Sequence, residues 1–213
     1  MLAIDKRSEP RELLEYRLQA DAVYDGPHFT SVKSIIRHQL LDEQGHLCAY
    51  CMGRIKPETM KVEHWLPQKG HTEMQLAYAN LLGVCKGNEG QAPANQHCDT
   101  HKGNLLISYN PANPAHRIED KIQYLGNGTI KASEAAFDKD LDKTLNLNES
   151  RLRANRKEVV EAVRRALAGK PGTRTKAQIE KYLHKWQFPA KTSERPAYAG
   201  VAIYWLTKYA KRR

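Results

Sequence analysis

Apolar residues recur at helical spacing near the start of the chain. Over residues 31–43 they return every three or four positions, which predicts an amphipathic helix that Thr30 or Ser31 can cap. A shorter helix is predicted over residues 9–20. We interpret residues 1–45 as an N-terminal helical lead-in and not as a site.

Helical spacing returns in the last third of the chain. Helices are predicted over residues 133–145, 150–168 and 197–209, and Thr175-Lys176-Ala177-Gln178 forms a capping-box sequence for a further helix. The late aromatic residues recur near helical spacing and are expected to fill a core in preference to stacking on bases: Trp186, Phe188, Tyr198, Tyr204, Trp205 and Tyr209. Residues 133–213 are therefore interpreted as a C-terminal helical region.

The middle of the chain lacks the helical period. Over residues 46–109, cysteines, histidines, glycines and short apolar runs such as VEHW and NLLGVC take its place. Residues 110–132 carry the turn signals NPANP and GNG, and they predict a linker or a small hairpin around KIQYLGNGTIKA. Short strands between two helical regions predict an α+β fold.

Composition argues against a membrane protein. The mean hydropathy is -0.70 and 27% of the residues are charged. No apolar run approaches the roughly 20 residues that a membrane-spanning helix needs. The first residues, MLAIDKRSEPRELLEY, lack the apolar core of a signal peptide. We expect a soluble, cytoplasmic protein.

The positive charge is concentrated in the C-terminal region. The formal net charge is +10, yet residues 1–130 hold 14 Lys and Arg against 15 Asp and Glu. Residues 131–213 hold 20 against 9. Such an excess suits a nucleic-acid partner, because basic side chains that neutralise phosphates release counterions. Solvated helix faces are the alternative interpretation.

Four cysteines predict a structural zinc site. Cys48 and Cys51 are spaced so that two thiolates on one tight turn reach the same ion, and Cys85 and Cys98 complete a set of four. Four thiolates leave no open position, so the zinc would staple the fold and take no part in catalysis. Buried free cysteines, or a three-cysteine site that includes His97, are the alternatives. A redox pair is not favoured, because its usual βαβ context is missing.

An acid stands beside a histidine just after the first cysteine pair. Glu63 offers a hard oxygen ligand for Mg²⁺, and a neutral His64 can take a proton from water near neutral pH. Pro67 indicates that the strand ends here, which lets both side chains serve one site. Phosphodiester hydrolysis needs both a cation and a base. Taken alone, the two residues are better explained as a surface Glu-His pair beside a buried Trp65.

Asn80 and the run Cys98-Asp99-Thr100-His101-Lys102 change that balance. The order C-x2-C, Glu-His-x-x-Pro, Asn-Leu before a third cysteine, and Cys-Asp-x-x-Lys resembles the HNH endonuclease family. The resemblance implies a β-hairpin followed by a helix, a ββα-metal module over residues 46–109.

The same resemblance implies roles for individual residues. His64 would be the general base, Asn80 would brace the loop between the strands, and Glu63 with Asp99 would hold Mg²⁺ or Mn²⁺. The family commonly places His or Asn at the position of Asp99, so His101 is the alternative ligand. His97 can approach either the site or the zinc. Lys102 is interpreted either as a phosphate contact or as a solvated lysine.

Further runs resemble the retron-associated and Septu-type (PtuB-like) HNH proteins. They include EPRELLEY, KSIIR, EQGHLCAYC and LNLN, and they cover nearly the whole chain. This likeness implies a role in bacterial antiphage defence beside an ATPase partner (PtuA-like) and, in retrons, a reverse transcriptase with its multicopy DNA. The basic C-terminal helices could then hold a partner instead of substrate.

Two functions follow as the main hypotheses, and a structural zinc protein with no nucleic-acid role is a third. The first is a metal-dependent endonuclease, for which DNA is favoured as the substrate and tRNA or other RNA is possible. The second is a zinc-stapled module that binds nucleic acid or protein and has an inactive HNH site.

Overall fold

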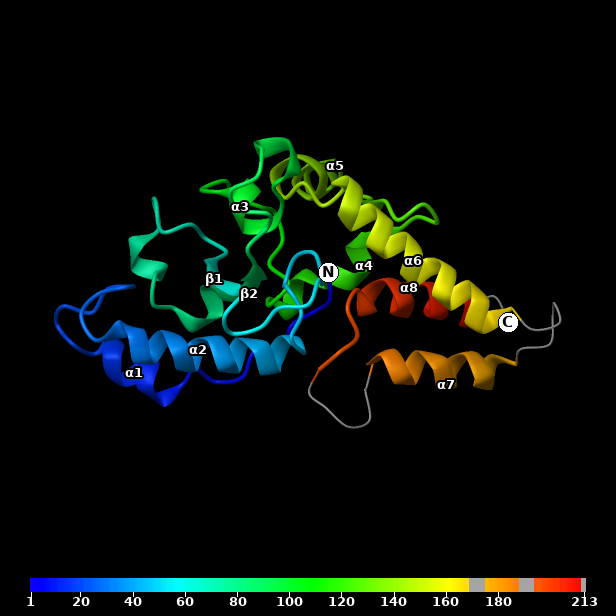
Figure 1. The fold of residues 1–213 in the computed structure, drawn as a ribbon. Helices are drawn as coiled ribbons and strands as arrows, with labels where there is room; N and C mark the ends of the chain where they lie inside the picture. Colours follow the sequence, from blue (N-terminus) through cyan, green and yellow to red (C-terminus); the bar gives the residue numbers. More distant parts are fainter. Residues whose placement is uncertain (169–174, 188–193, 212–213) are drawn as a thin grey trace.

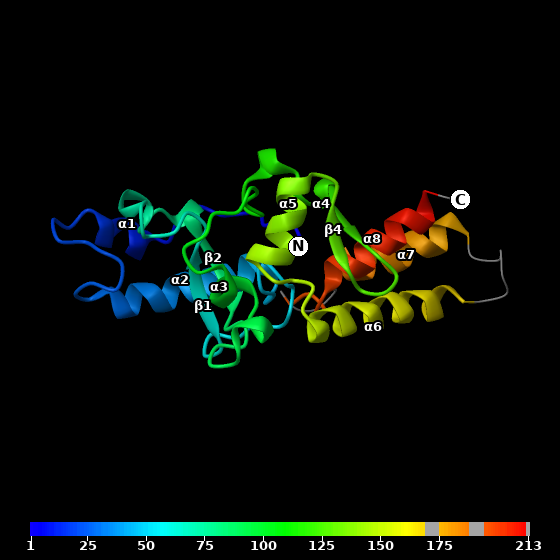
Figure 2. The ribbon, with the colours of Figure 1, turned by 90° about the horizontal axis from the view of Figure 1, so that it is seen from above.

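The computed structural model describes residues 1–168, 175–187 and 194–211. The elements lie along an extended molecule, with α1, α2, β1 and β2 at one end and α6, α7 and α8 at the other (Figures 1 and 2). Small two-stranded sheets among the helices confirm the predicted α+β class. Within the described residues, none of the helices combines the length and the apolarity needed to cross a bilayer.

The N-terminal end holds the two predicted helices, α1 (Arg11–Arg17) and α2 (Phe29–Gln44). α2 begins one residue before Thr30, so neither expected cap lies at its N-cap, which is His28 in a left-handed conformation. The helix ends at Gly45, whose φ of 61° suits a glycine. It buries the apolar face that the spacing predicted, formed by Phe29, Val32, Ile36, Leu40 and Leu41.

A β-hairpin followed by a short helix packs on α2. β1 (Met60–His64) pairs antiparallel with β2 (Leu81–Cys85), and α3 (Cys98–Lys102) contacts β2. The loop between the strands contains the 3-10 turns η1 (Thr72–Met74) and η2 (Tyr78–Asn80), and η3 (Pro93–Asn95) precedes α3. The buried Gln44 amide ties α2 to the hairpin, because it accepts from Gly83 N and donates to Gly83 O, each at 2.7 Å.

The predicted second hairpin is confirmed. β3 (Ile122–Tyr124) pairs antiparallel with β4 (Ile130–Ala132), after η4 (Pro114–His116) and α4 (Ile118–Lys121). The helix expected over residues 133–145 forms as α5 (Ala135–Lys139), and it continues as the π-helical turn η5 (Asp140–Thr144). Asn148 holds β4 in place, because its side chain accepts from Ile130 N and donates to Ile130 O.

The C-terminal end is helical, as predicted. α8 (Ala199–Ala210) packs against both α6 (Ser150–Leu167) and α7 (Lys176–Gln187). Thr175 and Gln178 form the expected capping box, with reciprocal bonds of 3.0 and 3.3 Å. Of the late aromatic residues, Trp186, Tyr198, Tyr204, Trp205 and Tyr209 pack against the hydrophobic clusters, whereas Phe188 lies outside the described residues.

The turn of the second hairpin lies against α6, so a larger residue at Gly128 is predicted to destabilise the protein. At Gly128 (φ +82°) an added Cβ would come within 2.0 Å of Arg153 O, whereas at Gly90 (φ +83°) nothing lies within 4 Å. Gly90→Ala should cost only the left-handed strain, about 1 kcal/mol of unfolding free energy. Gly128→Ala adds a backbone clash and should cost about 2 to 5 kcal/mol. Urea unfolding of both variants measures the difference, and equal losses would contradict the packing.

Candidate active site and metal centre

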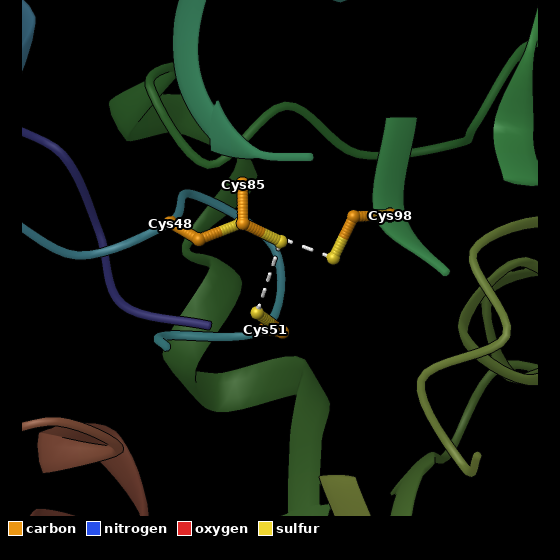
Figure 3. Close-up of side chains that lie close together, drawn as sticks. All are labelled: Cys48, Cys51, Cys85 and Cys98. Atoms are coloured by element: carbon orange, nitrogen blue, oxygen red, sulfur yellow. Dashed lines mark hydrogen bonds between the residues drawn. The ribbon is translucent and has the colours of Figure 1, made fainter. Parts of the chain in front are cut away.

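The four cysteines come together in one buried cluster. Their sulfurs all lie within 4.8 Å of one another. The Sγ atoms of Cys48 and Cys98 are 3.8 Å apart, and so are those of Cys51 and Cys85 (Figure 3). A zinc ion with four thiolates at about 2.3 Å places neighbouring sulfurs about 3.8 Å apart. The cluster therefore suits a tetrahedral metal such as zinc.

Three separate elements supply these sulfurs. Cys48 and Cys51 belong to a tight turn after α2, in which Cys48 N donates to Gly53 O and Gly53 N donates to Cys51 Sγ. Cys85 ends β2, and Cys98 begins α3 with a φ of 56°. The twelve residues between Cys85 and Cys98 form a loop that returns the chain to the cluster. A metal here would join α2, the hairpin and α3.

His97 lies beside the cysteines as a neighbour. Its Nδ1 is 3.2 Å from Cys98 Sγ and 3.9 Å from Cys85 Sγ. The four sulfurs are already mutually close, so the described geometry favours four thiolates, with His97 as a hydrogen-bonding neighbour. The three-cysteine alternative is not needed to complete the set.

A buried guanidinium lies near the cysteine cluster. Burial and the hydrogen bonds among the four thiols raise the pKa of Cys98 well above its ordinary value, whereas these hydrogen bonds hold that of Cys48 well below it. Arg156 is buried nearby, and within the described part of the chain it bonds only to neutral oxygens, those of Gly128, Leu147 and Asn148. Burial lowers the pKa of Arg156, and the sulfurs of Cys51 and Cys98 act in the opposite direction. Four thiolates around a divalent ion carry a net negative charge that offsets this guanidinium.

Glu63 is the most perturbed carboxyl of the hairpin. It is 5% exposed, and its Oε1 accepts from Tyr50 at 3.1 Å and from Lys102 Nζ at 2.7 Å. Burial and the adjacent Asp99 carboxyl raise its pKa to about 8, and Lys102 offsets only part of this. A carboxyl group whose ionisation is disfavoured by burial and by a second carboxyl beside it is one that a divalent cation can relieve.

His64 ends β1 and is held in one tautomer. Its Nε2 lies 2.9 Å from the carbonyl of Gln75, which can only accept, so the neutral ring carries its proton on Nε2. The Gln68 amide is a weaker neighbour at 3.4 Å. Burial lowers the pKa of His64, and the Tyr24 ring packs edge-on against it at 4.5 Å. No described residue bonds Nδ1, which is left as the acceptor.

Asn80 is buried at the end of the loop between the strands. Its Oδ1 accepts from Leu66 N at 2.7 Å, and its Nδ2 donates to the carbonyls of Leu66 and Met74 at 3.0 and 3.3 Å. It therefore ties both sides of the loop together. Gln75, which holds His64, directly follows Met74.

Asp99 and His101 point in different directions from α3. Asp99 lines the same pocket as Glu63 and His64. The Nδ1 of His101 instead lies 3.0 Å from the carbonyl of Thr144, and His101 does not line the pocket. Of the two residues expected as alternatives, the geometry therefore places only Asp99 with the candidate site.

Lys102 is neither solvated nor placed in the pocket where a phosphate would bind. Its side chain is 0% exposed, so it is not a solvated lysine, and its ammonium bonds to Glu63 and to the carbonyl of His64. A phosphate could not reach it without breaking the pair with Glu63. Lys102 is an internal counter-ion.

A pocket of about 390 Å³ opens over this group and draws on α2. The lining includes Lys33 and Arg37 from α2, Lys61 from β1, and Tyr24. The lining therefore includes residues of the segment 1–45, which the sequence predicts to be a helical lead-in. Lys33 and Arg37 are four positions apart and so share one face of the helix, which is a visible pattern. That this face of α2 lines the pocket follows only from the packing of α2 on the hairpin.

Comparison with known proteins gives one partial likeness. No model of a known protein family matches the chain. A protein of Vibrio cholerae serotype O1 biovar El Tor, named "Retron Vc95 putative HNH endonuclease", is 26% identical over 123 residues. The match covers 54% of this chain and 58% of that relative. The chain is thus similar, over about half of its length, to a protein named as an HNH endonuclease of a retron.

The cysteine cluster predicts one zinc ion for each chain. Cys48→Ser and Cys98→Ser should each lose the metal and fold poorly, because binding at such a site is worth on the order of 10 kcal/mol of folding energy. Elemental analysis and thermal unfolding of the purified proteins measure both effects. Soluble, zinc-free variants with the stability of the wild type would contradict a structural metal.

His97→Ala is the matched control for this experiment. It removes a neighbour of the cysteines and leaves four thiolates, so the zinc content should stay at one ion, with affinity lowered about 10- to 100-fold at most. Zinc loss as complete as that of Cys48→Ser would point to the three-cysteine site that includes His97.

Proposed function

We propose that this protein is a metal-dependent endonuclease of the HNH type, which hydrolyses phosphodiester bonds in nucleic acid. The observation that carries the proposal is His64, a buried neutral histidine with its proton on Nε2 and its Nδ1 unbonded, in one pocket with Glu63 and Asp99. The likeness to a protein named as an HNH endonuclease supports it. In this proposal the strand pair β1–β2 and the helix α3 form the ββα module.

Glu63 and Asp99 are the proposed ligands of one Mg²⁺ or Mn²⁺ ion, with His101 set aside because it bonds to Thr144. Both are hard oxygen donors, and the effect of Asp99 in raising the pKa of Glu63 fits a cation between them. A cation there would offset charge on the phosphate and on the leaving oxygen. The cysteine zinc is a different metal with a structural role.

The remaining residues of the site hold the base and its neighbours in place. His64 takes a proton from the attacking water at Nδ1, while the Gln75 carbonyl keeps the ring oriented. Asn80 fixes the loop that carries Gln75, so it acts as a positioning residue. Lys102 holds Glu63 through its 2.7 Å ion pair, in place of the phosphate contact that the family likeness implies.

The substrate and setting of the activity are also part of the proposal. DNA is favoured, with tRNA or other RNA as the alternative, since the chemistry acts on the phosphodiester group common to both. The name of the relative supports a retron setting. Antiphage defence beside an ATPase and a reverse transcriptase with its multicopy DNA is proposed from the sequence resemblance to retron-associated and Septu-type HNH proteins. The exposed basic side chains of α6, among them Arg153 and Lys157, would face substrate or such a partner.

One observation favours a second candidate function. The ammonium of Lys102 already neutralises Glu63 at 2.7 Å, as it would in a site that binds no cation. The chain would then be a zinc-stapled module that binds nucleic acid or protein without cutting it. Cleavage assays separate the two candidates.

The nuclease proposal predicts that His64→Ala loses activity. Removing a general base should lower kcat about a hundredfold to ten-thousandfold, with the zinc content unchanged. Wild type and variant are incubated with plasmid, single-stranded DNA and total RNA in Mg²⁺ or Mn²⁺, with and without the ATPase partner. Equal cleavage by both proteins would remove His64 as the base, and cleavage by neither would favour the binding module.

The pH dependence of cleavage follows from the direction of two pKa shifts. The pKa of His64 is lowered from 6.5, so the ring stays neutral below that pH. At saturating metal, kcat/KM should therefore hold from neutral pH down to about 6.5 and fall only at lower pH. Glu63, with a pKa raised to about 8, must lose its proton to bind a cation, so the apparent metal affinity should weaken as pH falls through 8. An acid limb above 6.5 at saturating metal would contradict the assignment of the base.

A further inference from the structure

Two buried donors in the candidate pocket lack partners. Within the described part of the chain, Arg37 Nε and the Tyr24 hydroxyl are buried and form no hydrogen bond. Both residues line the pocket that contains Glu63, His64 and Asp99. A buried donor without an acceptor costs roughly 1 to 3 kcal/mol, so two in one pocket indicate an acceptor that comes from outside.

Arg37 differs from the other cations of the site. Lys33 pairs with Asp25 at 2.7 Å. Lys61 pairs with Glu89 at 2.8 Å and with Asp99 at 3.5 Å, and Lys102 pairs with Glu63 at 2.7 Å. No ion pair of Arg37 is found among residues 1–168, 175–187 and 194–211. Arg37 is thus the pocket cation whose charge the described protein leaves available.

Tyr24 lies between His64 and α2. Its ring packs edge-on against His64 at 4.5 Å, and Lys33 Nζ lies 4.9 Å from its centroid. Lys33 and Arg37 share one face of α2, and the charge of Arg37 acts on the Tyr24 hydroxyl. Burial and Asp25 raise the pKa of Tyr24, so its hydroxyl stays protonated and acts as a donor.

We propose that Arg37 and Tyr24 bind one phosphate group of a nucleic-acid strand and position it against His64. The identity of the anion rests on the proposed nuclease function. Guanidinium groups match phosphate oxygens with two parallel hydrogen bonds, and Tyr24 supplies a further donor. The pocket also contains the carboxyl groups of Asp25, Glu63 and Asp99, whose negative charge opposes the binding of a phosphate. A cation that no described carboxylate already pairs with is therefore needed to hold a phosphate there.

Binding is tested in the full-length His64→Ala protein, which should hold substrate without cutting it. Fluorescence anisotropy follows a labelled DNA strand, alone and as a duplex, through a KCl series at fixed Mg²⁺. Adding Arg37→Ala should weaken binding about tenfold, and it should reduce the slope of log affinity against log salt by about 0.7 for the single strand or 0.9 for the duplex. Tyr24→Phe should weaken binding severalfold with the slope unchanged, because no charge is lost.

Two further variants separate phosphate binding from a structural role. Arg37→Lys keeps the charge, so the salt slope should remain while affinity falls with the loss of the paired hydrogen bonds. Arg11→Ala removes an arginine of α1 whose side chain is 85% exposed, and it should leave the DNA affinity unchanged. Because Arg37 has no described partner, Arg37→Ala should keep the Tm of the parent protein.

The outcomes distinguish this proposal from the proposed function. If the wild type cleaves nucleic acid and Arg37→Ala changes neither kcat/KM nor the salt slope, the phosphate assignment is overturned and the nuclease stands. If the wild type cleaves nothing but binding depends on Arg37 as described, the nuclease fails and the phosphate assignment stands. An absence of DNA binding in the parent protein overturns the assignment as well.

Discussion

The convergence of four sulfurs on one point is the constraint from which the rest of the site follows. The turn after α2, the end of β2 and the start of α3 are short segments, since the hairpin has two short strands and α3 has five residues. The sulfur cluster therefore adds a fixed point to the apolar core and to the hydrogen bonds between Gln44 and Gly83. Once Cys85 and Cys98 are joined, the neighbouring Asp99 and Lys102 face β1, where they meet Glu63. The positions of Glu63 and Asp99 therefore depend on the cysteine cluster. A metal bound by the four cysteines would fix the geometry of this acidic pair without contacting it.

The same centre couples the two ends of the molecule electrostatically. Arg156 belongs to α6, yet among the described residues its buried guanidinium finds only carbonyl and amide oxygens as hydrogen-bond partners. A buried cation without a carboxylate is costly unless negative charge lies nearby, and four thiolates around a bound divalent ion would supply it. The carbonyl of Gly128 accepts a hydrogen bond from Arg156, and its turn lies against α6. The second hairpin is therefore in contact with the same guanidinium.

The charges of the candidate pocket are nearly balanced, because most of the lining lysines and acids pair with one another. The lining residues all lie between Tyr24 and Asn104, so the positive excess of residues 131–213 contributes nothing to this lining. The available charge comes from Arg37, in the part of the chain whose overall balance is slightly acidic. A single unpaired guanidinium in a confined pocket has more influence on a phosphate than many solvated lysines on a helix face.

Local patterns in the sequence determined the elements, and packing decided the site. Hydrophobic spacing identified α2, α6 and α8, the turn residues identified the second hairpin, and Thr175 with Gln178 identified a capping box, because each depends on neighbours within a few residues. The cysteine spacing likewise predicted one cluster. By contrast, the bond from Lys102 to the carbonyl of His64 joins residues 38 positions apart, and the contact of His101 with Thr144 joins residues 43 positions apart. Arg37 likewise lines the pocket together with residues far along the chain, such as Asp99. No local period encodes such contacts, and only the tertiary structure, through the packing of α2 and α3 on the hairpin, decided them.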